Sequence, residues 1–193
     1  MMKFIQILLL SFALYGCTQT AEVKPNYMTE KIEYSSKNIL GFENLFGDGL
    51  NSMKNVKIFG VLHFPDNYDS SKQYPAVVAS HGSSNWRAHH LKYIEQMRQA
   101  GFIVLAMHPF DSRGVDSTVG NQINVTSETV IYDMAMSLNL LWDDSRINNQ
   151  KIYAAGWALA APQLYSMDGC HFKTHLIKVA LHMPVILCGI QVA

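Results

Sequence analysis

The sequence predicts an α/β fold with a mostly parallel sheet. Short apolar runs rich in β-branched residues, at 75–82, 102–108 and 151–156, have the length and composition of buried strands. Longer segments with apolar residues at helical spacing, at 90–101 and 127–142, lie between them. Strands that alternate with helices in this way favour a parallel sheet covered by helices.

The composition supports a folded domain, excludes intrinsic disorder and argues against a nucleic-acid partner. Of 193 residues, 49% are hydrophobic and 16% are charged, with 15 basic and 15 acidic side chains. An average soluble domain carries about 25% charged residues, so intrinsic disorder is excluded. The basic and acidic side chains balance, which argues against a nucleic-acid partner. The length suits one domain with its own core.

The first residues predict an export signal. A positively charged start precedes FIQILLLSFALYG, which has no charge and is short for a membrane-spanning helix. The run ends in LYGC at 14–17, a bacterial lipobox pattern apart from Tyr15, where a small residue is usual. We expect residues 1–16 to be a signal peptide and Cys17 to carry lipid in the periplasm. Because Thr18 follows, the outer membrane is favoured; an ordinary cleaved signal or a plain anchor helix is the alternative.

The next stretch is polar and rich in turn residues. Residues 17–54 are expected to form a tether and an irregular or edge-strand lead-in, which leaves 55–193 as the folded domain. Residues 56–64 have strand composition. A cluster of turn residues bounded by prolines separates them from the first buried strand at 75–82.

Two helices are predicted in the body of the chain. In the first, Leu91, Ile94 and Met97 are spaced for one buried face, and Gly101 is the C-terminal stop. The second is expected over 127–142, with Ser127 as its N-cap. Its apolar stripe consists of Val130, Met134, Leu138 and Leu141. A fourth apolar run follows the third strand at 176–190.

Residues suited to chemistry follow the buried strands. Ligands of open parallel sheets bind beyond the carboxyl ends of the strands. His81 and His108 follow the first two buried strands, and GWALA at 156–160 follows the third. A strand, a sharp turn and a helix with G-x-S-x-G in the turn make a nucleophile elbow. Here Ala158 stands where that motif has serine, and Ala160 replaces the second glycine.

These segments resemble the dienelactone hydrolase-like branch of the α/β-hydrolase superfamily, in an exported, lipoprotein-type form. The resemblance covers about residues 56–184. It is carried by PAVVASHGSS, GFIVLAMHPFDSRGVDSTVGNQ, YDMAMSLNLL, DDSRINNQKIYAAGW and FKTHLIKVALHMP. It implies a three-layer α/β/α fold and hydrolysis of carboxylic esters or lactones by a nucleophile, an acid and a histidine. It implies neither a cofactor nor a metal.

Two departures from the family pattern predict an inactive or severely impaired enzyme. The methyl group of Ala158 cannot attack a carbonyl, and loss of a serine nucleophile costs on the order of a million-fold in turnover. The sequence also ends at Ala193, before the positions where the resemblance places the acid and the histidine. We therefore expect an α/β-hydrolase domain that is truncated at its C-terminus.

The oxyanion hole of the family uses backbone groups, which Ala158 leaves in place. The expected donors are the N–H groups of Leu159 and of Ser83, with His81 shaping the loop. The ligand cleft is expected to be lined by Ser84, Trp86, Asp111, Arg113 and Trp157. A loop salt bridge of Asp111 and Arg113 is the favoured structural alternative.

Other polar residues are given structural interpretations. We expect Asp133 to hydrogen-bond a neighbouring loop. The adjacent His89 and His90 cannot face one metal ion from a helix. Cys170 and Cys188 are either a disulfide or two free thiols.

A second function belongs to another class. The protein would be a non-catalytic periplasmic lipoprotein that binds a small ligand or a protein partner through the remnant cleft. In this case too, the lipid on Cys17 would anchor the protein to the membrane.

Overall fold

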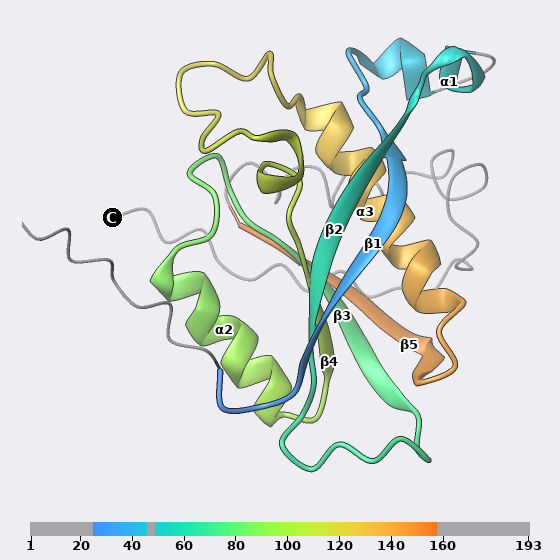
Figure 1. The fold of residues 1–193 in the computed structure, drawn as a ribbon, viewed down its shortest axis with the longest axis vertical. Helices are drawn as coiled ribbons and strands as arrows, with labels where there is room; N and C mark the ends of the chain where they lie inside the picture. The colour runs from blue at the N-terminus through green and yellow to red at the C-terminus, as the bar shows by residue number, and fades with distance from the viewer. Residues whose placement is uncertain (1–24, 46–48, 158–193) are drawn as a thin grey trace, which may run out of the picture.

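The computed structural model describes residues 25–45 and 49–157, and within them five strands form one mixed sheet in the order β1-β2-β4-β3-β5 (Figure 1). The three strands β4, β3 and β5 run parallel, and β2 and β1 add to the β4 side in antiparallel pairs. The strands are β1 (Thr29–Lys37), β2 (Asn55–His63), β3 (Tyr74–Ser80), β4 (Ile103–Met107) and β5 (Ile147–Gly156).

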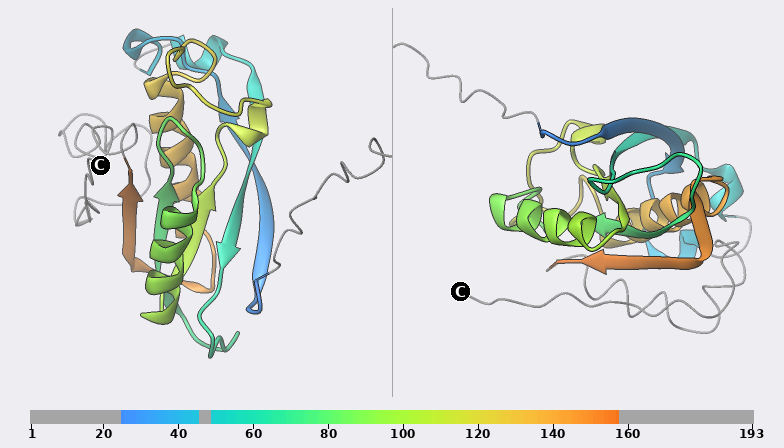
Figure 2. Two further views of the ribbon diagram at one scale, coloured as in Figure 1. Left: turned by 90° about the vertical axis from the view of Figure 1, so that its left-hand side faces the viewer. Right: turned by 90° about the horizontal axis from the view of Figure 1, so that it is seen from below.

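Helices cover both faces of the sheet, as the sequence predicts. The helix α2 (Ala88–Gln99) connects β3 to β4, and α3 (Ser127–Trp142) connects β4 to β5 (Figure 2). All five residues of β4 are buried, which explains its uninterrupted apolar sequence. The predicted three-layer α/β/α class is confirmed.

The residues of β4 divide between two hydrophobic cores on opposite faces. Ile103, Leu105 and Met107 belong to the larger core, which α3 completes. Val104 and Ala106 belong to the smaller core under α2. Successive side chains of a strand point to opposite faces, so one apolar strand supplies both cores.

The helix α3 occupies the predicted range, but its predicted N-cap was wrong by one residue. Thr126, with extended backbone, accepts a hydrogen bond from the backbone N–H of Thr129 at 3.1 Å, so it is the cap in place of Ser127. The Thr126 hydroxyl also bonds the carbonyl of Ile39. This second bond joins the start of α3 to the segment after β1, a partner that local sequence does not reveal.

The buried face of α2 agrees with the predicted one at Ile94 and Met97, which pack in the smaller core, but not at Leu91. Leu91 is 54% exposed, whereas the buried positions are His90, Ile94 and Arg98. The prediction missed His90 and Arg98 because both are polar and are buried against distant partners, Trp157 and Asp66. Arg98 pairs with Asp66 and with Glu95, one turn before it. Gly101 has φ +91°, a conformation that favours glycine, and ends the helix as predicted.

The edge strand β1 lies inside the stretch expected as tether and lead-in. It pairs with β2 along all nine residues. The Tyr34 hydroxyl at its middle bonds Ser137 of α3 at 2.6 Å. Its sequence, TEKIEYSSK, has little apolar content because its outer edge and one face meet solvent. The short helices η1 (Phe42–Leu45) and α1 (Gly49–Ser52) follow.

Several predictions fall outside the described residues. They are the signal peptide at 1–16, the lipid site at Cys17 and the fourth apolar run at 176–190. In the part of the chain that the structure describes, no helix is long and apolar enough to span a membrane.

Candidate functional site

The parallel strands β3, β4 and β5 bring three predicted site segments together at their carboxyl ends. Ser80 at the end of β3 pairs with Gly156 of β5, and the N–H of Trp157 donates to the carbonyl of Ser80 at 3.3 Å. His81 therefore lies beside Trp157, and His108 follows the neighbouring strand β4. This is the strand end where ligands bind in open α/β sheets.

His81 is a neutral imidazole buried in aromatic surroundings. It is 2% exposed, and its ring lies edge to face with Phe110 and Trp86 at centroid distances of 4.5 and 5.5 Å. Burial lowers the pKa of His81 to about 4. Its Nδ1–H donates to the carbonyl of Gly82 at 2.8 Å, so Nε2 is a hydrogen-bond acceptor. Among the described residues, this Nε2 has no partner.

Trp86 is the centre of the aromatic cluster. Its Nε1–H donates to the carbonyl of Met107 at 3.1 Å, which joins the loop after β3 to the end of β4. Its ring lies 5.6 Å from His90, 6.0 Å from His108 and 6.1 Å from Trp157. The indole of Trp157 is buried, and its Nε1–H has no partner within the described ranges. Both predicted cleft tryptophans thus pack at the strand ends.

The loop after β3 is held by backbone hydrogen bonds. The Asn85 N–H donates to the Gly82 carbonyl at 3.0 Å, which closes a turn around Ser83 and Ser84. The carbonyl of Ser83 accepts from the Thr118 N–H at 2.9 Å. The segment that carries the predicted oxyanion donors is therefore fixed to the loop after β4. The other predicted donor, Leu159, and the nucleophile position Ala158 lie outside the described residues.

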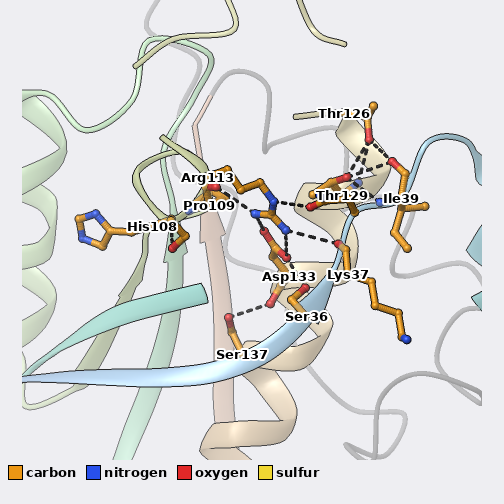
Figure 3. Close-up of polar contacts among 12 residues, drawn as sticks. Ser36, Lys37, Ile39, His108, Pro109, Arg113, Thr126, Thr129, Asp133 and Ser137 are labelled. Atoms are coloured by element: carbon orange, nitrogen blue, oxygen red, sulfur yellow. Dashed lines mark hydrogen bonds and ion pairs between the residues drawn. The ribbon is translucent and has the colours of Figure 1, made fainter. Parts of the chain in front are cut away.

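Arg113 is occupied in a structural network instead of facing a ligand. Its guanidinium forms two hydrogen bonds with Asp133 of α3, at 2.7 and 3.0 Å (Figure 3). It also donates to the carbonyls of Pro109 and Lys37 and to the side chain of Asn38. The expectation that Asp133 bonds a neighbouring loop is confirmed. The predicted cleft role of Arg113 is not supported by this geometry, because its donors are used within the fold.

Asp111 has different partners from those predicted. It does not pair with Arg113, because the turn of η2 (Asp111–Arg113) directs the two side chains to different neighbours. One carboxylate oxygen accepts from Nδ1 of His108 at 2.6 Å, and the other accepts from Nδ2 of Asn85 at 2.7 Å. Partial burial raises the pKa of Asp111, but these two hydrogen bonds outweigh it and leave that pKa below its ordinary value.

The sequence pattern placed His108 at a strand end without giving it a role, and Asn85 was not among the predicted site residues. His108 and Asn85 hold both oxygens of Asp111, from two different strand ends. The available signal was the spacing His-x-x-Asp directly after a buried strand, which places both side chains on one tight turn. Asn85 carried a weaker signal: asparagine tolerates the left-handed backbone that it adopts here, with φ +66°.

The buried histidine of α2, His90, caps its own helix. His90 Nδ1 accepts from the Arg87 backbone N–H at 3.0 Å and thereby caps the helix. Burial lowers the pKa of His90 to about 4. Across residues 25–45 and 49–157, no three histidine, cysteine or acidic side chains are grouped to hold a metal ion.

Comparison with solved structures identifies the fold. The α/β hydrolase GrgF from Penicillium sp. sh18 superposes with a TM-score of 0.51 at 14% identity, over 74% of this chain and 42% of GrgF. The protein m3DLH superposes with a TM-score of 0.46 at 15% identity, over 70% of this chain and 52% of m3DLH. Esterase 2 of Thermogutta terrifontis superposes with a TM-score of 0.45 at 17% identity, over 56% of this chain and 40% of the esterase.

The sheet order, the two helical layers and the likeness to GrgF define an α/β-hydrolase fold. At 14% identity, the likeness concerns the fold alone. This chain spans less than half the length of GrgF. No protein-family model and no curated protein sequence matches the chain.

Proposed function

We propose that the protein is an esterase-like α/β hydrolase of the dienelactone hydrolase type that binds a small carboxylic ester or lactone at the strand ends. The observation that carries the proposal is the pairing of Ser80 with Gly156. This pairing brings the His81-Gly82 turn beside Trp157, where the elbow sequence begins. In an α/β hydrolase, the oxyanion donors come from these two segments.

The chemistry of the strand ends supports binding of a carbonyl compound. The buried Nε1–H of Trp157 is a hydrogen-bond donor without a partner among the described residues, and a carbonyl oxygen is a suitable acceptor. Aromatic rings around it provide the apolar surface that an acyl group needs. Because Ala158 has no nucleophilic atom, we propose that the bound ester forms no acyl-enzyme.

Binding and acylation are tested separately on the full chain. Phenylacetamide, an amide analogue of the ester, is expected to quench tryptophan fluorescence saturably. The quenching should be lost in Trp157→Phe and kept in Trp142→Phe, a matched change at the end of α3. A phosphonate ester probe should leave no covalent adduct by mass spectrometry. An adduct, or equal quenching in both variants, would contradict the proposal.

We further propose that the protein is exported as a lipoprotein through Cys17, on the strength of the LYGC sequence. In a bacterial host fed with labelled palmitate, the chain is expected to take up label and to sediment with membranes. Cys17→Ser should lose both properties, while Cys170→Ser should keep them. Membrane association that survives Cys17→Ser would favour a plain anchor helix.

A further inference from the structure

We propose that His108 and Asp111 form a general-base dyad that activates water against an acyl carbonyl held at the same strand ends. The inference rests on the ester binding proposed above. It adds a catalytic group that acts without any nucleophile at position 158. The dyad belongs to the loop after β4, which carries none of the elements of a nucleophile elbow.

The carboxylate of the dyad is fixed through both of its oxygens. His108 Nδ1 lies 2.6 Å from one oxygen of Asp111, and Asn85 Nδ2 lies 2.7 Å from the other. Asn85 is itself held, because its side-chain oxygen accepts from the Trp86 N–H at 2.7 Å. Asn85 is also the one non-glycine residue with positive φ in the described part of the chain. Unusual backbone of this kind is common where a side chain must be positioned for function.

The imidazole of the dyad is also held from its faces and its backbone. The ring of His108 stacks on Phe59 at a centroid distance of 4.8 Å and an interplanar angle of 15°. The His108 N–H donates to the Phe59 carbonyl at 3.0 Å, and the Ser112 hydroxyl donates to the His108 carbonyl at 2.6 Å. The side chain remains 20% exposed, so water can reach it. Figure 3 shows the ring pointing away from the Arg113–Asp133 pair.

This geometry leaves a basic nitrogen available. Nδ1–H donates to the carboxylate of Asp111, so the lone pair lies on Nε2. A carboxylate in this position keeps the imidazole in one tautomer and stabilises the imidazolium that forms when Nε2 takes a proton. The charged or titratable groups that interact with His108 are its partner Asp111 and the neighbouring histidines His81 and His63. Burial lowers the pKa values of both His81 and His63 to about 4, so neither adds positive charge near neutral pH.

The proposed step is a hydrolysis with water as the nucleophile. His108 Nε2 takes a proton from water as the water oxygen bonds to the acyl carbon. The tetrahedral intermediate then breaks the bond to the leaving oxygen, which receives the proton from Nε2. Ester and water are consumed, acid and alcohol are released, and the dyad returns to its starting state. General-base assistance of this kind contributes about 10²–10⁴-fold.

The test measures hydrolysis of p-nitrophenyl acetate by the full chain, corrected for buffer. His108→Ala is expected to lower the rate at least about 100-fold, and added imidazole should restore part of it in that variant. His89→Ala, a change of an exposed histidine on α2, should leave the rate unchanged. Asp111→Asn should lower the rate about tenfold or more, because the amide no longer holds the imidazole in its basic tautomer.

Two further readouts separate the possible failures. Nitrogen NMR of the His108 ring should show the proton on Nδ1, and His108→Gln provides a second variant if His108→Ala fails to fold. Equal rates in the protein and its His108 variants, with phenylacetamide quenching intact, would overturn the dyad and leave the ester-binding proposal standing. If the hydrolysis rate depends on His108 but phenylacetamide causes no quenching, the proposed ester site is wrong as the place where His108 acts.

Discussion

Replacing Arg113 with alanine is expected to lower the free energy of unfolding by about 3–5 kcal/mol, the cost of removing one partner of a buried ion pair. The side chain of Asp133 is fully buried and that of Arg113 is 6% exposed, so water cannot take the place of the guanidinium. Of the described residues, Ser36 would remain as a donor to the Asp133 carboxylate. Urea denaturation followed by circular dichroism measures the loss.

The loss should depend on pH in a defined direction. Burial raises the pKa of Asp133, and the hydrogen bonds and charge of Arg113 oppose that shift without cancelling it. Without Arg113, the pKa of Asp133 in the folded state rises further above its unfolded value. The folded variant then binds more protons than the unfolded chain, so its stability falls as the pH rises above the unfolded pKa of about 4. We expect Arg113→Ala to be closest to the parent protein in acid.

Two controls isolate the buried pair. Lys57→Ala removes an ion pair with Glu33 that is exposed on both sides, and no measurable loss is expected. The double variant Arg113→Ala/Asp133→Ala removes both charges, so it should be more stable than Arg113→Ala alone. A double variant that is less stable by the full sum of the single changes would show that the two side chains act independently.

The Arg113 network also connects the site to the edge of the sheet. Arg113 joins the loop after β4 to the end of β1 through the Lys37 carbonyl and Asn38. The same short turn, η2, carries Asp111 and begins three residues after His108. Arg113, which was predicted to line the cleft, thus holds the loop after β4 in place.

The sequence predicted those parts of the fold whose burial is visible locally. The strands β3 and β4, the second half of β5 and the helix α3 are largely apolar or carry a clear apolar stripe, because these parts are mostly covered. The first part of β5, from Asn148 to Gln150, is polar and mostly exposed, and the sequence did not predict it as strand. The edge strand β1 has neither signal, because solvent meets its outer edge and one face. On α2, His90 and Arg98 are buried by aromatic and ionic partners that no periodicity reveals.

In the site too, local sequence patterns predicted some features, whereas other features depend on partners that only the tertiary fold brings near. The pairing of β3 with β5 brings His81, Trp86 and Trp157 together. The alternation of strands and helices predicted a parallel sheet but not its strand order. The partners of Asp111 and Arg113 depend on the direction in which one tight turn aims two side chains. Residues two apart on such a turn point to different neighbours, here His108 and Asp133, and sequence spacing did not distinguish them.

Phe110→Ala is expected to cost about 3–5 kcal/mol of unfolding free energy, the usual range for a fully buried aromatic residue cut to alanine. Phe110 is 1% exposed and packs in the larger core, and its ring also lies against His81 at a centroid distance of 4.5 Å. Its removal leaves a cavity between the core and the loop after β3. Phe42→Ala, at a position that is 48% exposed, should change stability by less than about 0.5 kcal/mol.

The same substitution should change the titration of His81. Burial lowers the pKa of His81 to about 4, and Phe110 supplies part of that burial. With the ring gone, water gains access to the imidazole, so we expect the pKa of His81 to rise toward the ordinary histidine value of about 6.5. Proton NMR titration of His81 in the parent, Phe110→Ala and Phe42→Ala proteins measures the shift. If the stability falls as expected while the pKa of His81 stays near 4, the burial of this imidazole must come from Trp86 and the strand ends instead.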